Sequence, residues 1–362
     1  MKKIFIGFVL LCYVFVSNAQ SPNLKKMWKL YEDKKYEKLI EFGTELLKKD
    51  SVNIEYNFWV GRAYYREDEI DKAFPHFLKA AQHNDPHSTI RSRANIYLGI
   101  YYFLKEDKVK SREVLEDSRK IETYSNIEES SEMWYEMFGF DQFYNDWSLF
   151  ETDHFRFYFQ DTTDINYKRF ISDCELAFTN INLFFESELP KKIDYFIWGS
   201  RIDAKNVLKR NLSFTGSYLC YIHGGNNETE GHEIAHDIAH YCTEIDESSN
   251  FISEGTATYF DQTNLDRKAY FEELTDNTKK KKIFVKDVWE NWYDYSYDFS
   301  YNMAGLFVEE LIKKYGRDKF IEFYSNQTYK NALEVFGKDF SAFTKKFELD
   351  YNLIKQKEKS FY

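Results

Sequence analysis

The sequence predicts an α+β protein built from a helical N-terminal domain and a second domain in which strands precede helices. Apolar side chains recur at helical spacing through residues 22–125. From residue 150 the pattern changes, and residues 154–159 include alternating aromatic side chains, as a strand does. A length of 362 residues suits two domains. We therefore expect a helical domain over 20–125, a connector over 126–149 and an α+β domain over 150–362.

Residues 1–19 have the pattern of a secretory signal peptide. Lys2 and Lys3 precede an apolar run over residues 4–16, and Ser17-Asn18-Ala19 offers a cleavage site with small residues. The apolar run is too short to cross a bilayer comfortably, and no other segment is apolar enough. We expect an exported protein, periplasmic or extracellular, without a membrane span.

The composition restricts the partners. A net charge of -11 disfavours nucleic acid and anionic membrane surfaces. Aromatic residues make up 19% of the chain, which predicts aromatic core packing and leaves a polysaccharide- or envelope-binding surface as an alternative. Cys174, Cys220 and Cys242 remain after the signal peptide, too few for a disulfide scaffold. A Cys220–Cys242 disulfide and three buried thiols both stay open.

The helical region carries a weak internal repeat. Its clearest copy contains Val60-Gly61-x-x-Tyr64, and Leu98-Gly99-x-x-Tyr102 repeats the pattern further on. This resembles the tetratricopeptide repeat, in which two helices pack through large, small and aromatic positions. The resemblance implies a short solenoid whose concave face could bind a protein partner. A plain helical bundle is the alternative.

The elements of the second domain follow from periodicity and from residues that end helices. Pro190 ends one helical pattern, and Gly316 ends another. In order, we expect a strand over 154–159, a helix over 166–186, strands over 193–198 and 217–223, a helix starting near 228–231, and helices over 301–315, 318–324 and 339–350.

The stretch His232-Glu233-Ile234-Ala235-His236 reads H-E-x-x-H. Residues four apart share one face of a helix, so both imidazoles can bind one metal ion. A catalytic zinc takes three protein ligands and keeps one position for water. Glu233 is placed to accept a proton from that water. Glu254 is the natural third ligand, and we expect one Zn²⁺ per chain.

Three motifs together resemble the gluzincin metallopeptidases, the thermolysin-like group, and most closely the peptidase MA-like type. They are H-E-x-x-H, Glu254-Gly255-x-Ala257-x-Tyr259-Phe260 and Tyr301-x-x-Ala304-Gly305-x-Phe307. The resemblance covers about residues 150–351. It implies that His232, His236 and Glu254 bind zinc, that Glu233 is the general base, and that the strand over 217–223 holds an extended peptide by main-chain pairing. Nothing matches the Gly-x-Met-x-Asn strand of the aminopeptidase branch, so endopeptidase and exopeptidase activity both stay open.

The histidine cluster allows a second register. His236 and His240 are also four apart, which would place Asp237 in the position of the base. A site with three histidines is disfavoured, because His232 and His240 lie roughly 12 Å apart along a straight helix. We expect His240 to lie beside the ligands or in the core without binding the ion. Asp237 and Asp246 are candidates to orient the zinc-binding histidines.

A peptide hydrolase also needs a donor for the developing oxyanion. Tyr301 is the first candidate, Tyr295 and Tyr297 are alternatives, and His223 is an outside choice. The function we predict is an exported zinc metallopeptidase that hydrolyses peptide bonds. The alternative is a non-catalytic binding protein whose metallopeptidase-like domain is degenerate or structural. The presence of Glu233 argues against that alternative, because a structural zinc site needs no base.

Overall fold

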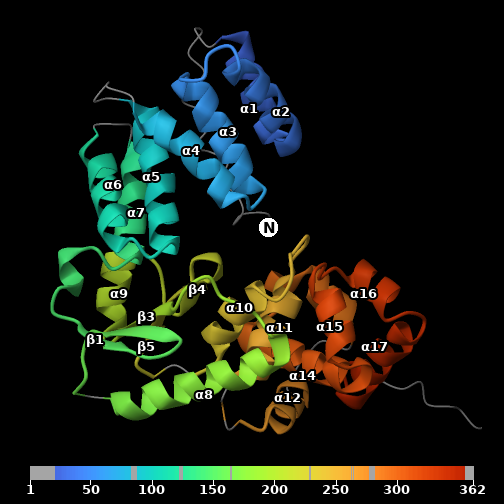
Figure 1. Cartoon of the computed structure of the whole chain (residues 1–362). Coiled ribbons are helices and arrows are strands. Elements are labelled where there is room, and N and C mark those ends of the chain that lie inside the picture. Colours follow the sequence, from blue (N-terminus) through green and yellow to red (C-terminus); the bar gives the residue numbers. More distant parts are fainter. Residues whose placement is uncertain are drawn as a thin grey trace, which may run out of the picture. The chain divides into compact units, whose positions relative to one another are not determined.

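The chain divides into two compact units, residues 1–145 and 146–362. A computed structural model describes residues 21–82, 88–121, 125–163, 165–227, 230–261, 263, 265–276 and 282–354 (Figure 1). The signal peptide predicted at residues 1–19 lies outside this range. The secondary structure is α+β, as the sequence predicts. No described helix is both long and apolar enough to cross a membrane.

The described part of the first unit is helical, and each helix packs against the next. Two glycines account for the Gly position that the two copies of the sequence repeat share. A Cβ on Gly61 would lie 3.0 Å from the ring of Phe77, and a Cβ on Gly99 would lie 2.6 Å from Leu115 Cγ. Equivalent glycines therefore let two successive helix pairs approach closely. The helices are α1 (Pro22–Glu32), α2 (Tyr36–Leu47), α3 (Ile54–Arg66), α4 (Ile70–Ala81), α5 (Thr89–Leu104), α6 (Lys108–Lys120) and α7 (Ser125–Met137).

The first unit extends further than predicted. Helix α7 and the short 3₁₀ helix η2 (Gln142–Tyr144) occupy most of the expected connector over 126–149. Helix α7 packs against α5 and α6, and the Phe138 ring just after it stacks on Phe103 at 3.8 Å between centroids. Tyr135, Phe138 and Phe140 of this acidic segment are buried, which is why the helical domain does not end at residue 125.

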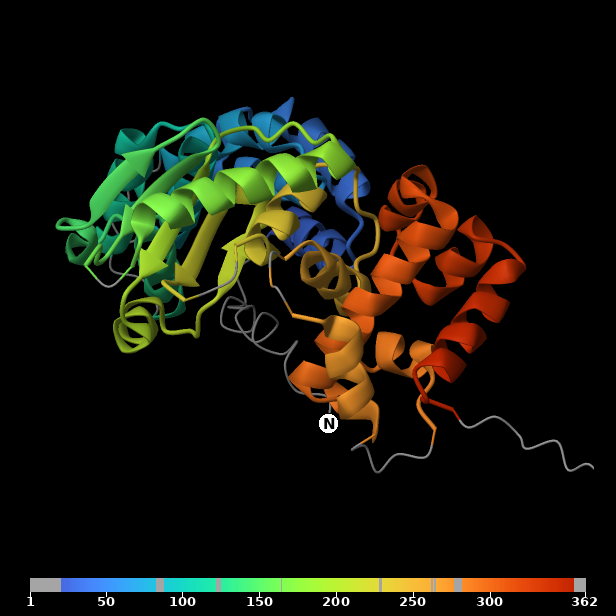
Figure 2. The ribbon, with the colours of Figure 1, turned by 90° about the horizontal axis from the view of Figure 1, so that it is seen from below.

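The second unit contains a five-stranded sheet in the order β1-β2-β3-β5-β4. The three central strands run parallel, and both edge strands run antiparallel to their neighbours. The long helix α8 lies along one face of the sheet (Figure 2). The strands are β1 (Ser148–Glu151), β2 (Phe155–Phe159), β3 (Ile193–Trp198), β4 (Phe214–Gly216) and β5 (Tyr221–Gly225), with helices α8 (Tyr167–Phe185) and α9 (Arg201–Leu208) between them.

Alternation along β2 builds the core between the sheet and α8. Phe155, Phe157 and Phe159 are fully buried, as expected for residues that share one face of a strand. They belong to the same core cluster as Phe170 and Phe178 of α8. The aromatic strand predicted from the sequence therefore supplies one wall of this core.

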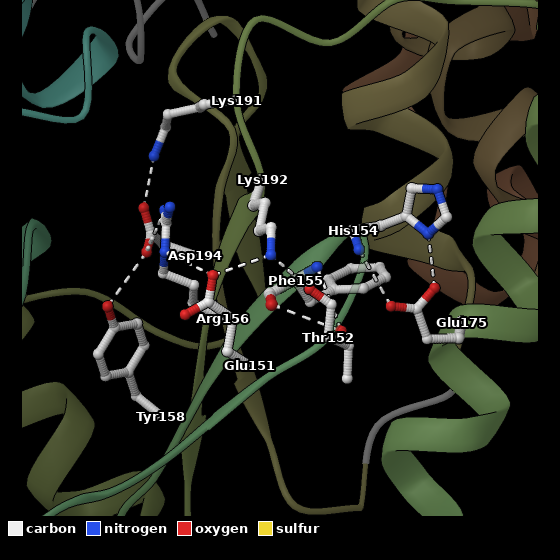
Figure 3. Close-up of polar contacts among 10 residues, drawn as sticks. All are labelled: Glu151, Thr152, His154, Phe155, Arg156, Tyr158, Glu175, Lys191, Lys192 and Asp194. Atoms are coloured by element: carbon white, nitrogen blue, oxygen red, sulfur yellow. Dashed lines mark hydrogen bonds and ion pairs between the residues drawn. The ribbon is translucent and has the colours of Figure 1, made fainter.

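The opposite face of β2 and β3 carries polar side chains (Figure 3). Asp194 is fully buried and forms an ion pair with Lys191, which is also buried. Arg156 Nη1 lies 3.8 Å from the same carboxylate, and the Tyr158 hydroxyl donates to Asp194 Oδ1 at 3.2 Å. A buried carboxylate is tolerated only with such partners, so these contacts hold β3 in place beside β2.

The strand predicted over 217–223 is displaced. Residues Ser217–Leu219 form a 3₁₀ helix, η3, and the strand that follows, β5, reaches Gly225. The pair Gly224-Gly225, which resembles a turn in sequence, lies within β5. A Cβ on Gly224 would lie 2.9 Å from the Tyr195 hydroxyl, so this strand needs a glycine there. Because β5 is an interior strand between β3 and β4, it cannot pair with a substrate, and the peptide-holding role expected for residues 217–223 is wrong.

The remaining helices follow the sheet. Helices α10 and α11 contact each other, and α10 contacts α8 and β4 while α11 contacts α14. The helices predicted over 301–315, 318–324 and 339–350 are present, although the first begins four residues earlier. The elements are α10 (His232–His240), α11 (Asn250–Phe260), α12 (Arg267–Asp276), α13 (Val285–Glu290), η4 (Trp292–Asp294), α14 (Tyr297–Tyr315), α15 (Arg317–Tyr324), α16 (Tyr329–Val335) and α17 (Asp339–Asp350).

The three cysteines of the described residues are free thiols. Cys174 and Cys220 are buried, and Cys242 is half-buried. The disulfide between Cys220 and Cys242 that the sequence left open is therefore not formed in this structure.

Candidate metal centre

Helix α10 begins at His232 because Gly231 precedes it with a φ of 119°, a backbone conformation that favours glycine. The acidic Glu233 lies in the first turn, where negative charge stabilises a helix. Ile234 and Ile238 are buried in the core. His232 and Glu233 line a pocket on the other side of the helix, so the local sequence fixes which face carries the chemistry.

Helix α11 brings Glu254 to the same pocket. Ser249 caps the helix, because its Oγ accepts a hydrogen bond from the Ile252 backbone N–H at 3.2 Å. Glu254 Oε2 lies 3.4 Å from Nε2 of His232 and 3.4 Å from Nε2 of His236. The ligand atoms that these three residues offer all lie within 4.8 Å of one another.

This donor set fits a zinc ion. Two imidazole nitrogens and one carboxylate oxygen converge, which is a common protein ligand set of catalytic zinc. The side chains are 17% (His232), 13% (His236) and 24% (Glu254) exposed, so the group is reached from the pocket. The structure therefore brings together the three residues that the sequence nominated as metal ligands.

Electrostatics favour a cation between these groups. Burial raises the pKa of Glu254, but hydrogen bonds from His232 and His236 outweigh burial and hold that pKa well below its usual range. Burial lowers the pKa of His236, but its hydrogen bond to Glu254 and the Glu254 charge outweigh burial and raise it to about 9. Without metal the group keeps a proton, and a divalent ion would displace it.

The pocket has a volume of about 980 Å³ and also contains Glu233. One wall is formed by residues just before and within β4, including Arg210, whose guanidinium lies 3.6 Å from the ring centroid of Phe214. Burial lowers the Arg210 pKa, and the charges of Tyr221 and Glu233 partly offset this effect. The edge strand β4 thus runs beside the metal ligands and beside the candidate base.

Neither aspartate that was a candidate to orient the zinc-binding histidines has a hydrogen bond to His232 or His236 among the described residues. Ser253 Oγ lies 3.4 Å from His236 Nδ1. Asp237 is fully buried and accepts a hydrogen bond from the Thr215 hydroxyl, and Asp246 is exposed. The prediction for both aspartates is therefore wrong, because residue 237 faces β4 rather than the pocket.

The alternative register fails for the same reason. Burial raises the pKa of Asp237 well above its usual value, and this side chain is not among the described residues that line the pocket. The ring of His240 packs on Tyr241 with 4.9 Å between centroids, and His240 does not belong to the group of His232, His236 and Glu254. The distance between His232 and His240 along a straight helix already argued against His240 as a ligand of the same ion, and the structure agrees with that prediction.

Tyr301 is the oxyanion candidate that lies closest to the ligand group. Its ring is stacked 6.1 Å from that of His232, and Tyr297 stacks on it at 3.9 Å. Burial and the charge of Glu254 raise the pKa of Tyr301 well above its usual value. The phenol therefore stays protonated at neutral pH and can donate a hydrogen bond. Tyr297 also lines the pocket but is 66% exposed.

The two other candidates lie elsewhere. Tyr295 packs against Phe299 with 5.8 Å between ring centroids. His223 is buried in β5, where the Trp198 indole N–H donates to its Nδ1 at 3.0 Å. Neither is among the described residues that line the pocket, so Tyr295 and His223 are wrong as oxyanion donors.

A close crossing of α11 and α14 sets the distance between the third ligand and Tyr301. A Cβ on Gly255 would lie 2.7 Å from the Ala304 carbonyl oxygen, and a Cβ on Gly305 would lie 2.7 Å from Thr258 Cγ2. The glycines of the second and third motifs therefore face opposite helices at one crossing. They hold residues 254 and 301 on the two sides of the same pocket.

Sequence reasoning missed several pocket residues. Thr258 lines the pocket and could have been found, because it follows Glu254 by one helical turn. Arg210 lies in a loop whose path no local pattern specifies. Ser253 could not be found, because its contact with His236 depends on how two helices cross.

No protein-family model matches the chain, and no curated protein sequence shows significant similarity to it.

Proposed function

We propose that this chain is an exported zinc-dependent hydrolase of peptide bonds, with a thermolysin-like domain over the second unit. The observation that carries the proposal is that Glu254 Oε2 lies at the same 3.4 Å from the Nε2 atoms of His232 and His236. An acidic residue beside the first histidine and a large pocket support it further. Export rests on the signal-peptide pattern alone.

When bound, zinc would acidify a water molecule and polarise the scissile carbonyl. Glu233 would accept the proton from the attacking water and pass it to the leaving amine nitrogen. A C–O bond forms and the C–N bond breaks, so the products are a carboxylate and an amine. Tyr301 would donate a hydrogen bond to the carbonyl oxygen as negative charge develops there.

The substrate would bind as an extended chain. Among the described residues β4 pairs only with β5, as the last strand in the sheet order, and Phe214 and Thr215 line the pocket. An edge strand offers main-chain groups to an added strand. This replaces the expectation that placed the substrate on residues 217–223.

The helical unit would bind a protein partner. Gly61 against Phe77 and Gly99 against Leu115 are equivalent contacts in successive helix pairs, which supports a tetratricopeptide-like repeat. Such repeats present an extended surface to their partners. Capture of a partner by residues 20–145 alone would test this part of the proposal.

Metal content and turnover test the main proposal. The mature protein should hold one zinc per chain, and Glu254→Ala should lose most of it. Glu233→Gln should keep the zinc and lose cleavage of denatured casein by more than a hundredfold. Full activity in Glu233→Gln would refute the role of the base. Zinc bound without any turnover in the wild type would favour the non-catalytic binding protein instead.

A further inference from the structure

Arg210 lines the metal pocket with a charge that no ion pair within the described residues neutralises. The residue is exposed and borders the same pocket as Glu233 and Glu254. Its guanidinium contacts the ring of Phe214 and forms no ion pair or hydrogen bond with a described residue. Glu233 acts on it only through its charge at longer range. Within the described part of the chain, the pocket therefore contains an accessible cation without a counter-ion.

A stack of rings holds this guanidinium in place. Arg210 Cζ lies 3.6 Å from the centroid of the Phe214 ring, and Phe214 is a buried residue of β4. On the sheet, the Phe214 ring stacks on His223 of β5 at 5.2 Å between centroids, and the Trp198 indole N–H fixes His223. A ring accepts no conventional hydrogen bond, so the N–H donors of the guanidinium stay available to a ligand.

The carboxylates that line the pocket have other positions or partners. Glu254 belongs to the candidate metal ligands, and the Asp261 carboxylate is paired with Arg267. Asp298 is exposed in the first turn of α14, so a cationic group of the substrate could bind it without competing for Arg210, which stacks on β4. The four carboxylates on the pocket are Glu233, Glu254, Asp261 and Asp298.

The chemistry of a guanidinium favours a carboxylate as its ligand. The planar group can donate two parallel hydrogen bonds to the two oxygens of a carboxylate, whereas a main-chain carbonyl offers one neutral oxygen. Burial lowers the pKa of Arg210, which means that protein surrounds the charged group even though the residue remains accessible. An anion would replace the interactions with water that the guanidinium has lost.

Resting on the proposed peptidase function, we propose that Arg210 binds a carboxylate of the substrate close to the cleaved bond and so determines specificity. In a peptide this carboxylate is either the side chain of glutamate or aspartate or the C-terminal carboxylate. The first source would make the enzyme selective for acidic side chains, and the second would make it release short C-terminal fragments. Arg210 would bind the substrate without taking part in the chemical step.

Phosphinic peptides, in which a zinc-binding phosphinate replaces the cleaved bond, test this without turnover. The neutral reference carries glutamine on both sides of the phosphinate and a C-terminal amide. Three probes change one group each: glutamine to glutamate before the phosphinate, glutamine to glutamate after it, or the amide to a free carboxylate. Calorimetry on the zinc-loaded protein should show one probe bound about tenfold to a hundredfold more tightly than the reference. The probe that gains identifies the source of the carboxylate.

Two variants locate the effect. Arg210→Gln should bring the ratio of the affinities for the preferred probe and the reference close to one. Lys209→Gln is the matched control, because it removes the same charge one residue away from a side chain that does not line the pocket and that donates to the Asn206 backbone carbonyl. This variant should keep the wild-type ratio. Both positions are exposed, and thermal unfolding checks that each variant is folded.

Three outcomes overturn the inference. They are a wild type that binds none of the three charged probes more tightly than the reference, a preference that persists in folded Arg210→Gln, and a preference that Lys209→Gln reduces as much as Arg210→Gln does. The last result would mean that the overall charge of this region, not contact with Arg210, attracts the probe. Failure of the proposed function looks different, because then no phosphinic peptide binds the zinc-loaded wild type, the neutral reference included.

Discussion

Ser253 Oγ lies 3.4 Å from Nδ1 of His236, so the residue before the third ligand contacts the second one. If Nε2 of His236 faces the metal, Nδ1 carries the proton and donates it to Ser253. The buried Tyr324 of α15 lies beside Ser253. This connects the ligand histidine to the C-terminal helices.

Removal of that contact should weaken zinc binding. Ser253→Ala should lower zinc affinity by about tenfold, because groups that orient ligand histidines contribute roughly ten- to hundredfold. Competition with a coloured chelator measures the affinity. Ser300→Ala serves as control, since Ser300 is buried and bonds only backbone carbonyls of its own helix. Equal zinc affinities of Ser253→Ala and the wild type would contradict the orienting role.

Gly255→Ala should open the crossing of α11 and α14. The added methyl would lie 2.7 Å from a backbone oxygen of Ala304, which cannot move away cheaply. We expect a loss of about 1–3 kcal/mol in unfolding free energy, together with weaker zinc binding. Gly199→Ala is the control, because its Cβ would meet Asp161 Cβ only at 3.3 Å. The prediction fails if both variants unfold at the same denaturant concentration.

The two threonines of α11 should respond oppositely to the loss of a hydroxyl. Thr258→Val removes a buried hydroxyl without a partner among the described residues, so the metal-free protein should gain about 1 kcal/mol. Thr256→Val removes a hydroxyl that donates to Ile252 and should lose about 1 kcal/mol. Urea unfolding of both variants checks the signs. A loss of stability in Thr258→Val would show that its hydroxyl has a structural partner.

Tyr301→Phe should lower kcat by about a hundredfold with little change in KM, because an oxyanion donor acts in the transition state. Tyr297→Phe, which changes an exposed neighbour on the same pocket, should have a much smaller effect. Steady-state kinetics on one peptide substrate measure both. A kcat of Tyr301→Phe near that of the wild type would assign the oxyanion to another donor.

His76 in the helical unit should make the protein sensitive to acid. Burial, with a smaller contribution from Lys79, lowers its pKa to about 4 from an ordinary 6.5, and its Nδ1 lies 2.9 Å from Asn57 Oδ1. Between pH 6.5 and 4 the unfolded chain binds the proton and the folded chain does not, so stability falls as the pH drops through that window. His76→Gln should flatten the fall in melting temperature between pH 7 and 4. An unchanged pH profile would show that His76 does not cause it.

The sequence was sufficient where the geometry is local. His232 and His236 share a helix face by spacing alone, and the structure brings them together with Glu254. Phe155, Phe157 and Phe159 were readable as one face of a strand. Each of these predictions needs only the period of a single element.

It was insufficient where two elements meet. Asp237 and Ser253 are both one residue away from a ligand, and only the crossing of α10 with α11 decides which of them reaches His236. Gly224-Gly225 resembles a turn when only the local sequence is considered. The reason for a glycine at position 224 is the ring of Tyr195, which comes from another strand and leaves no room for a side chain. Helix α7 was missed because its sequence is acidic, and its buried side chains are covered only when it packs against α5 and α6.

The brevity of β4 has a consequence for what this protein can hold. Three residues present only a few main-chain groups, so this edge is a poor template for joining the sheet of another molecule. If β4 holds the substrate as proposed, a passing flexible chain would gain the same few hydrogen bonds and would insert a side chain into the pocket as well. Residence at the edge would then be brief for any segment whose side chain does not fit, and cleaved fragments, held by fewer bonds still, would leave quickly.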